Sequence, residues 1–247
     1  MPGLALDRLT HRPLVVAIDG PSGSGKSTVS RRVAARLGLA YLDTGAMYRA
    51  VCWSVLEHAV DLQDAEAVAE HARRLPLVLG TEPDAPTVRV GDTDVTAAVR
   101  ETRISAVVST VATNLGVRAE LRRRQREIID ATRLGEHRGC VAEGRDITTV
   151  VAPDADVRIL LTADEQARLA RRALEVHGSA DAGALAATRD QVLRRDADDA
   201  TVSSFHVAAD GVLRLDSSHL DLDQTVQAVL DAIAELAPVG ADAGHPS

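Results

Sequence analysis

The sequence predicts an α/β fold built on a parallel β-sheet that helices cover on both faces. Short apolar runs rich in β-branched residues alternate with longer amphipathic stretches along most of the 247-residue chain. A glycine-rich loop joins the first apolar run to the first amphipathic stretch, as expected where a strand leads into a helix. With 45% hydrophobic residues, the chain can form one substantial core and has length left for an inserted lobe.

The first sixty residues contain two strand–helix pairs. We expect the first strand at Leu14–Ile18, an uninterrupted apolar run, and the first helix at Ser27–Leu37, which Gly38 ends. A short extended segment follows at Ala40–Asp43. Thr44 then has a side chain suited to the N-cap of a helix that runs to about residue 57.

The pattern changes between residues 61 and 133, where prolines and short runs replace the regular alternation. A helix is expected at 64–74, short strands at 75–79, 87–90 and 94–95, and further helices at 102–113 and 116–133. We interpret this segment as a lobe inserted into the α/β core, which comprises residues 13–60 and 134–236.

The strand–helix alternation returns after residue 134. Strands are expected at 139–143, 157–161 and 212–215, and helices at 164–176, 182–195 and 222–236. Residues 1–12 and 237–247 are expected to be disordered, the latter because they are rich in Gly, Ala and Pro.

The strongest functional signal is the segment Gly20–Ser27, which matches the phosphate-binding pattern GxxxxGK[ST] in full. Its glycines leave backbone N–H groups free to converge on phosphate oxygens, the following helix adds the positive end of its dipole, and the Ser27 hydroxyl can bind Mg²⁺. Lys26 is the only lysine among 28 basic residues, so an ammonium stands where a compact charge has to fit between phosphates. The loop predicts binding of a nucleoside triphosphate.

The composition narrows the class of protein. A net charge of −8 and a pI of about 5.5 argue against a nucleic acid or an anionic membrane as partner, because both require a basic face. The two cysteines, Cys52 and Cys140, have no CxxC spacing, so neither a disulfide framework nor a zinc site is expected. No run approaches the roughly 18 apolar residues of a membrane-spanning helix. We expect a cytoplasmic monomer.

Three motifs in order along the chain resemble those of the bacterial cytidylate (CMP) kinases, a family of P-loop nucleoside monophosphate kinases. They are Asp19–Thr28, which contains the glycine loop, then Tyr41–Arg49, and finally Glu143–Asp146. The resemblance extends from about Val15 to Leu236. It implies a five-stranded parallel core, a CMP-binding insertion at 61–133 and a helical lid at about 163–204. The implied activity, in pyrimidine nucleotide metabolism, is transfer of the γ-phosphate of ATP to CMP or dCMP with Mg²⁺.

The resemblance also implies roles for individual residues. ATP would be bound by Gly20, Pro21, Ser22, Gly23, Ser24, Gly25, Lys26, Ser27 and Thr28, with Ser27 as a ligand of Mg²⁺. The catalytic cations would be Lys26, Arg145 and Arg195. CMP would be bound by Arg49, Arg145 and Arg195 at its phosphate, by Asp199 at its ribose, and by Thr44, Ser109, Arg118 and Asp146 around its base.

An acidic side chain and an arginine that contact one edge of the base would let the site discriminate cytosine from uracil. The acid can accept a hydrogen bond from the exocyclic amine, and the arginine can donate to the carbonyl or ring nitrogen. A buried partner left unpaired by the wrong base costs about 1–3 kcal/mol. Hydrogen bonding has to provide most of this recognition, because the chain has only four aromatic residues for stacking, Tyr41, Tyr48, Trp53 and Phe205.

Several residues also have purely structural interpretations. Asp43 and Asp146 are suited to capping a helix or turn, and Ser109 to an ordinary helix hydroxyl. Arginines 122–124 and 171–172 are expected on solvated helix faces or on helix faces where they bridge to another element. We interpret the acidic pair at 164–165 as a first helical turn and not as metal ligands. Glu143, at a strand end, is suited to orient a Mg²⁺-bound water or an arginine.

The predicted lid departs from the family pattern at Asp198 and Val202, where many relatives have basic residues. The sequence therefore leaves open which cations complete the lid. Arg168, Arg171 and Arg172, on the preceding helix, are the candidates.

Two other functions stay open and two are excluded. A P-loop kinase for another small acceptor such as UMP would have the same core, and an inactive nucleotide-binding regulator would have the same motifs. A Ras-like switch is excluded because its Asn-Lys-x-Asp element requires a second lysine. A protein kinase is excluded because the chain has no His-Arg-Asp.

Overall fold

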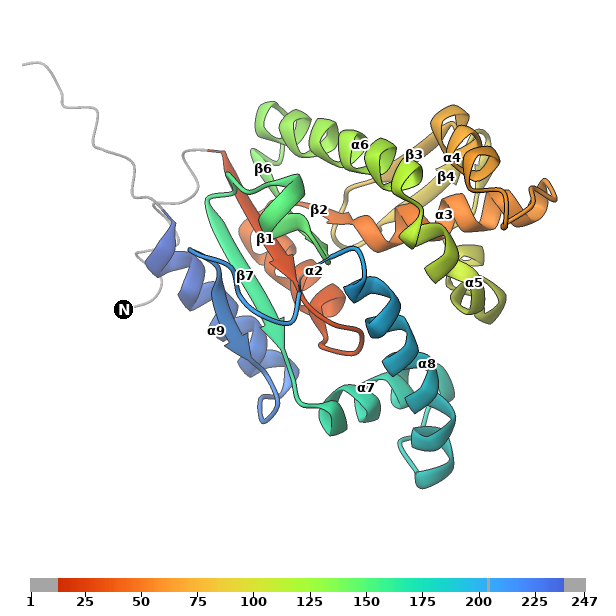
Figure 1. Ribbon diagram of the computed structural model, residues 1–247. Coiled ribbons are helices and arrows are strands. Elements are labelled where there is room, and N and C mark those ends of the chain that lie inside the picture. Colours follow the sequence, from red (N-terminus) through yellow and green to blue (C-terminus); the bar gives the residue numbers. More distant parts are fainter. Residues whose placement is uncertain (1–12, 204, 238–247) are drawn as a thin grey trace, which may run out of the picture.

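The computed structural model describes residues 13–203 and 205–237 and contains a five-stranded β-sheet (Figure 1). Its strands are, in spatial order, β2 (Ala40–Asp43), β6 (Gly139–Gly144), β1 (Leu14–Asp19), β7 (Val157–Thr162) and β8 (Leu213–Asp216). Every pair of neighbouring strands is parallel. The predicted five-stranded parallel α/β core is confirmed.

The central strand β1 is apolar on both faces, as a strand covered by helices on both sides must be. Val15 and Ala17 pack into one hydrophobic core, and Val16 and Ile18 pack into a second core on the opposite face. All residues of the strand are buried. This explains why the sequence shows a continuous apolar run here and not an alternating one.

Helices cover both faces of the sheet. On the face of Val16, α2 (Lys26–Leu37) packs beside α9 (Leu222–Leu236). On the face of Val15, α3 (Thr44–Glu57) and α6 (Leu115–Leu134) contribute to the core. These helices lie within a residue or two of their predicted ranges.

Residues 61–133 combine helices with a second, antiparallel sheet. They contain α4 (Ala65–Arg74), β3 (Leu77–Gly80), β4 (Thr87–Val90), β5 (Thr93–Asp94), the 3-10 turn η2 (Ala98–Arg100), α5 (Thr102–Thr113) and most of α6. Figure 1 shows this segment on the β2 side of the molecule. Val68, Ile104 and Leu121 belong to the same hydrophobic core as Val15 of β1. The segment therefore shares its core with the parallel sheet.

Aspartates cap two of the helices that begin near the carboxyl edge of the sheet, α3 and α7 (Glu165–His177). Asp43 accepts a hydrogen bond from the N–H of Ala46 at 2.9 Å, so the prediction that Thr44 caps α3 was wrong, and Thr44 is the first helical residue. Asp164 caps α7 in the same way, as the structural interpretation of this acidic turn predicted. Such caps satisfy N–H groups that have no partner inside the helix.

A π-helical turn, η3 (Ile147–Val151), follows β6 and was not predicted. The buried carboxylate of Asp19, at the end of β1, accepts hydrogen bonds from the N–H of Ile147 at 3.0 Å and from the N–H and hydroxyl of Thr148 at 2.8 and 2.6 Å. These bonds join the end of β1 to the chain after β6. They fix the glycine loop relative to the Glu143–Asp146 motif.

Helices α7 and α8 (Ala182–Ala200) form a hairpin at the lower right of Figure 1. α8 continues to Ala200 and does not end near Arg195 as predicted. Because of this extension, Asp196 and Asp199 lie on the helix, where they can act from one rigid element.

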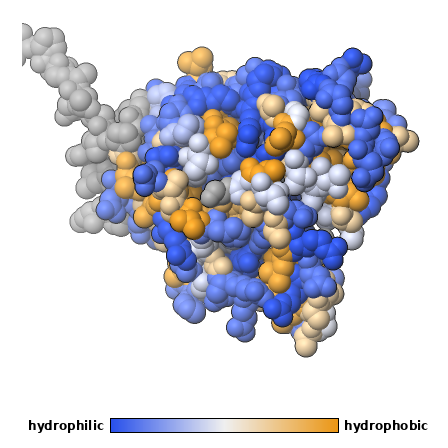
Figure 2. All heavy atoms as spheres, in the orientation of Figure 1, coloured by the Kyte–Doolittle hydropathy of each residue, from blue (hydrophilic) through white to orange (hydrophobic). Residues whose placement is uncertain are grey.

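No helix in the described part of the chain is long and apolar enough to cross a bilayer. The face of the molecule in Figure 2 is mostly hydrophilic, with apolar side chains in small separate groups. The disorder expected at 1–12 and 237–247 falls, apart from Ala237, outside the described residues.

Two glycines with positive φ angles provide a test of the central strand pairing. A Cβ on Gly139, which starts β6 at φ 131°, would lie 2.0 Å from the carbonyl oxygen of Leu14, whereas a Cβ on Gly38, at φ 64°, would meet nothing within 4 Å. We expect Gly139→Ala to lower the free energy of unfolding by more than about 3 kcal/mol, and Gly38→Ala by about 1–2 kcal/mol. Urea denaturation followed by circular dichroism measures both losses. Equal losses would contradict the close contact of β1 with β6.

Candidate active site

The glycine loop lies at the carboxyl end of β1 and leads directly into α2. Gly23 and Gly25 adopt positive φ angles of 75° and 86°, and Gly25 is the N-cap of α2. A Cβ on Gly20 would come within 2.2 Å of the carbonyl oxygen of Leu161 in β7. The path of the backbone therefore requires glycine at these positions. No side chain caps the first N–H groups of α2, which suits the helix N-terminus to an anion.

Lys26 is the first residue of α2, and its Nζ donates to the carbonyl oxygen of Pro21 at 3.3 Å. Burial, and next the positive charge of Arg145, lower the pKa of Lys26. The ammonium thus lies in an environment that disfavours its charge. A phosphate in the glycine loop would reverse this effect, because an opposite charge nearby favours the ionised form.

A cleft extends from the glycine loop to α5 and α6, and the predicted site residues line it, except Gly20, Pro21, Ser24 and Ser109. The first three lie in the glycine loop itself. Ser109 is half-buried on α5, where Val108 and Ala112 line the cleft in its place, so its contact with the base stays a prediction. Thr44, at the start of α3, donates to the carbonyl oxygen of Glu143 at 2.6 Å.

Guanidinium groups converge in the part of the cleft next to the glycine loop. Arg49 of α3 donates to the hydroxyl of Ser105 at 2.9 Å. Burial lowers the pKa of Arg49, and Arg195 and Arg172 lower it further. The pKa of Arg195 is lowered in turn by burial and by Arg145. Like charges this close destabilise one another until an anion binds between them.

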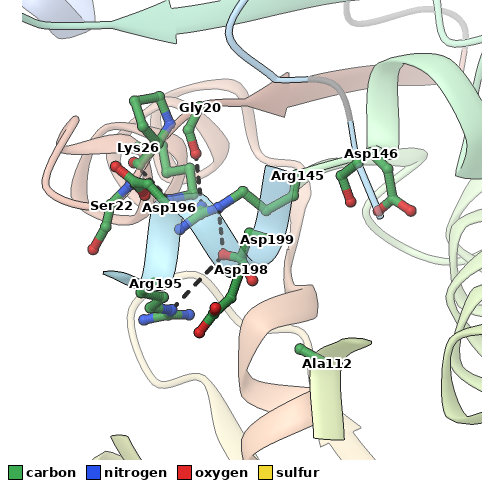
Figure 3. A network of polar contacts seen from close by, with 12 residues as sticks. Gly20, Ser22, Lys26, Ala112, Arg145, Asp146, Arg195, Asp196, Asp198 and Asp199 are labelled. Carbon is green, nitrogen blue, oxygen red and sulfur yellow. Dashed lines mark hydrogen bonds and ion pairs between the residues drawn. The ribbon is translucent and has the colours of Figure 1, made fainter. Parts of the chain in front are cut away.

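Arg145 is held from three directions (Figure 3). Its Nη1 donates to the carbonyl oxygen of Gly20 at 2.6 Å, and its Nε donates to Asp199 at 3.1 Å. Its guanidinium lies 5.1 Å from the ring centroid of the buried Phe205. Asp199 is also 3.9 Å from Nε of Arg195. One carboxylate of α8 therefore contacts both predicted catalytic arginines.

The α7–α8 hairpin is bonded directly to the glycine loop. Asp196 accepts from the N–H of Ser22 at 2.9 Å and forms a buried ion pair with Arg168, whose Nη1 donates to the carbonyl oxygen of Ser22 at 3.1 Å. Arg171 donates to the carbonyl oxygen of Ser24 at 3.3 Å. Arg171 therefore bridges α7 to the glycine loop, which is one of the two roles expected for it.

Of the three candidate lid cations, only Arg172 lines the cleft. It also forms an ion pair with Glu175, on the same helix, at 2.8 Å. Asp198 and Val202, where the chain departs from the family pattern, do not line the cleft. Arg172 of α7 therefore adds a positive charge to the cleft, beside Arg195 of α8.

At the far end of the cleft, two arginines of α6 bind Asp146. Arg118 donates to Oδ2 at 2.6 Å, and Arg122 donates to the same oxygen from Nε at 2.9 Å and from Nη2 at 2.6 Å. The side chains of Asp146 and Arg118 are only 6% and 5% exposed. Arg122 therefore bridges α6 to the chain after β6, which is one of the two roles expected for it, and Asp146 makes no side-chain cap. A buried ionic cluster stands at this end.

Arg118 also connects this cluster to its surroundings. Its Nη1 donates to the carbonyl oxygen of Ala112 in α5 at 3.0 Å, and its Nη2 donates to the hydroxyl of Ser203 at 2.7 Å. Its guanidinium lies 5.9 Å from the ring centroid of Tyr48. Among the described residues, neither Nε of Arg118 nor the hydroxyl of Tyr48 has a hydrogen-bond partner. Arg118 is thus fixed from several sides.

Glu143 ends β6 beside the glycine loop, and its carboxylate accepts from the hydroxyl of Tyr41 at 2.8 Å. Burial raises the pKa of Glu143, and Asp43 raises it too, whereas Lys26 and Ser27 lower it. Such a buried carboxylate is stabilised by a nearby cation. Its position at a strand end was the sequence signal, although the residue was not assigned to the site.

The described residues contain no cluster of three His, Cys, Asp or Glu side chains that could hold a metal ion by themselves. A cation in the cleft would have to take most of its ligands from a bound phosphate and from water. Mg²⁺ binds in this way at nucleotide sites.

Comparisons with known proteins relate the chain to one family. The family model described as Cytidylate kinase matches residues 16–235. The cytidylate kinase of Cutibacterium acnes is 48% identical over 230 residues, which cover 91% of this chain and 98% of the relative. The cytidylate kinase of Streptomyces avermitilis is 43% identical over 223 residues, which cover 90% and 93%. Together with the cleft between Lys26 and Asp146, these matches show that the chain belongs to the cytidylate kinase family.

Proposed function

We propose that this protein transfers the γ-phosphate of ATP to CMP or dCMP, giving ADP and CDP or dCDP. Its membership of the cytidylate kinase family supports this reaction. The roles of the residues are supported by one observation, a single cleft with a phosphate-binding loop at one end and the buried Arg118–Asp146 pair at the other. The two nucleotides would face each other across the arginines between these ends.

The acceptor phosphate needs positioning more than activation. Its second pKa is about 6, so it is mostly dianionic near neutral pH and requires no strong base. The two nucleotides repel each other, and cations between them offset the repulsion while they hold the reacting atoms in line. Lys26, Arg145 and Arg195 would contact the transferred phosphoryl group. Arg49 and Arg172 would hold the acceptor phosphate.

We assign Mg²⁺ to the space beside Ser27 and Glu143. Ser27 supplies a hydroxyl at the start of α2, and Glu143 supplies a buried carboxylate that the hydroxyl of Tyr41 orients. Oxygen donors of this kind suit Mg²⁺, which keeps several water and phosphate ligands. When bound, the ion would neutralise charge on the β- and γ-phosphates.

The nucleoside of CMP would lie along α6 and α8. Asp146 would accept a hydrogen bond from the amine of cytosine, with Arg118 and Thr44 beside the base. Asp199 would accept from the ribose, and its Oδ1 is suited to this because both arginine contacts use Oδ2.

The α7–α8 hairpin would act as a lid, and residues 61–133 as the lobe that binds the acceptor. The hairpin and the chain after it contact both ends of the cleft, through Asp196 on Ser22 and through Ser203 on Arg118. Closure would exclude water from the transfer. The proposal includes a cytoplasmic monomer without a nucleic-acid partner, which the net charge of −8 supports.

An assay of ADP release with ATP, Mg²⁺ and a panel of CMP, dCMP, UMP and AMP tests the proposal. We expect the highest kcat/KM with CMP or dCMP. A preference for UMP would support a P-loop kinase for another acceptor. Binding of ATP without turnover of any acceptor would support an inactive regulator.

Lys26→Ala removes the ammonium from the glycine loop. We expect kcat to fall by about 10²–10³-fold because this charge acts on the transferred group, while the affinity for CMP changes little. Steady-state kinetics and equilibrium titration with CMP measure the two effects. Arg36→Ala, on the exposed side of the same helix, is the matched control. Equal activity in the two variants would contradict the role of Lys26.

Arg172→Gln removes the cation that α7 contributes to the cleft. We expect KM for CMP to rise by about tenfold, since a charge-assisted contact to phosphate is lost, with little change in KM for ATP. The control is Arg189→Gln, which breaks an exposed ion pair with Glu165 in the same hairpin. An unchanged KM for CMP in Arg172→Gln would remove Arg172 from the phosphate clamp.

Glu143→Gln removes the buried charge beside Ser27. We expect the Mg²⁺ concentration for half-maximal activity to rise by about 10–100-fold. Tyr41→Phe, which deletes only the hydrogen bond to Glu143, should give a smaller shift. Titration of activity with Mg²⁺ at fixed ATP measures both, and identical curves for Glu143→Gln and the parent would exclude Glu143 from the metal site.

A further inference from the structure

We infer that Arg122 is a positioning residue that turns Asp146 so that one carboxylate oxygen, Oδ1, is left to accept a hydrogen bond from the exocyclic amino group of cytosine. The inference rests on the proposed function and extends it to a residue outside the predicted site. Its basis is that the two carboxylate oxygens of Asp146 accept unequal numbers of hydrogen bonds.

Every hydrogen bond that a guanidinium group donates to Asp146 is accepted by Oδ2. Arg118 contributes one, at 2.6 Å, and Arg122 contributes two, at 2.9 Å from Nε and 2.6 Å from Nη2. A side-on arginine–carboxylate pair would place one N–H on each oxygen. Here both N–H groups of Arg122 point to the same oxygen, so three donors occupy Oδ2.

The other oxygen, Oδ1, receives no hydrogen bond from the described residues, yet it is not one of the enclosed polar atoms without a partner. Asp146 lines the cleft, and its side chain is 6% exposed. The exposed part therefore includes Oδ1, on a side chain that lines the cleft. An acceptor in so small an opening is poorly hydrated, so a ligand that brings an N–H donor to it gains free energy.

This arrangement distinguishes an amino group from a carbonyl at the same position of a pyrimidine. Cytosine presents N–H donors there, which match an oxygen that can only accept. Uracil presents a carbonyl oxygen, so two acceptors would face each other and neither would be paired. A carboxylate free to turn would lose part of this discrimination because Oδ1 would no longer be held toward the base.

Arg122 and Arg118 lie one helical turn apart on α6, and both reach Asp146. Arg118 also donates hydrogen bonds to the carbonyl oxygen of Ala112 and the hydroxyl of Ser203, so its substitution would disturb the surrounding packing. The recorded hydrogen bonds of Arg122 all go to Asp146, and its side chain is 29% exposed against 5% for Arg118. A change at Arg122 therefore acts on the orientation of Asp146 more than on the fold.

The test compares Arg122→Gln with Arg123→Gln, which removes the next arginine of the helix, 53% exposed and paired with Glu120 and Glu127. Each variant is assayed with CMP, with UMP, and with a CMP analogue in which hydrogen replaces the amino group of the base. We expect Arg122→Gln to lower kcat/KM for CMP about tenfold, mainly through KM, and to change UMP and the analogue less than about twofold. Arg123→Gln should match the parent with all three.

Arg122→Lys distinguishes the effect of the positive charge at residue 122 from its effect on the orientation of Asp146. An ammonium keeps the charge but lacks the fork of two N–H groups. We expect its ratio of CMP to UMP activity to lie between those of the parent and Arg122→Gln. Full rescue by lysine would overturn the positioning role.

Equal losses in Arg122→Gln with CMP, UMP and the analogue, or no loss with CMP, would also overturn the inference. A parent enzyme that does not prefer CMP would overturn the proposed function itself, whatever the variants do.

Discussion

The cleft depends on keeping several positive charges close together before any ligand binds. Carboxylates hold the cations from the side, as Asp199 does for Arg145 and Arg195. Burial first, and neighbouring arginines second, lower the pKa values of Lys26 and Arg49. Two phosphate chains that repel each other in water would both be stabilised here. The cost of assembling the cations is met by the folded protein before the nucleotides arrive.

Helix α8 connects the two ends of this arrangement. Asp196 is bonded to Ser22 of the glycine loop, and Asp199, one turn later, is bonded to Arg145. Ser203, just after the helix, is bonded to Arg118 beside the proposed base site. A rigid helix with these contacts cannot move without changing all three regions. Closing the lid and assembling the cations would therefore be one event and not two.

The sequence predicted the fold where local patterns decide it, and it missed contacts whose partners are far away along the chain. The apolar run of β1 and the glycine at the end of α2 have only one reasonable interpretation. Arg122 and Arg171 were expected on solvated or bridging helix faces because their neighbours in the helix are charged, and the sequence could not identify their partners, which lie 24 and 147 residues away. Phe205 under Arg145 had no local signal. One signal in the sequence could have indicated a role for Arg122 at the site. It lies one helical turn after Arg118, which was predicted to contact the base.

The contacts of Arg145 and Arg118 explain why arginine and not lysine occupies these two positions. Arg145 bonds to a carbonyl oxygen and a carboxylate while its face lies over an aromatic ring, and Arg118 bonds to three different groups. A planar guanidinium with five N–H donors can satisfy such partners at once, and an ammonium cannot. Lys26 has one recorded hydrogen bond, at 3.3 Å, so its charge is held loosely. A compact ammonium can follow a phosphoryl group as it moves between two nucleotides. In the proposed transfer, Arg118 and Arg145 would stay fixed and Lys26 would be the cation that adapts.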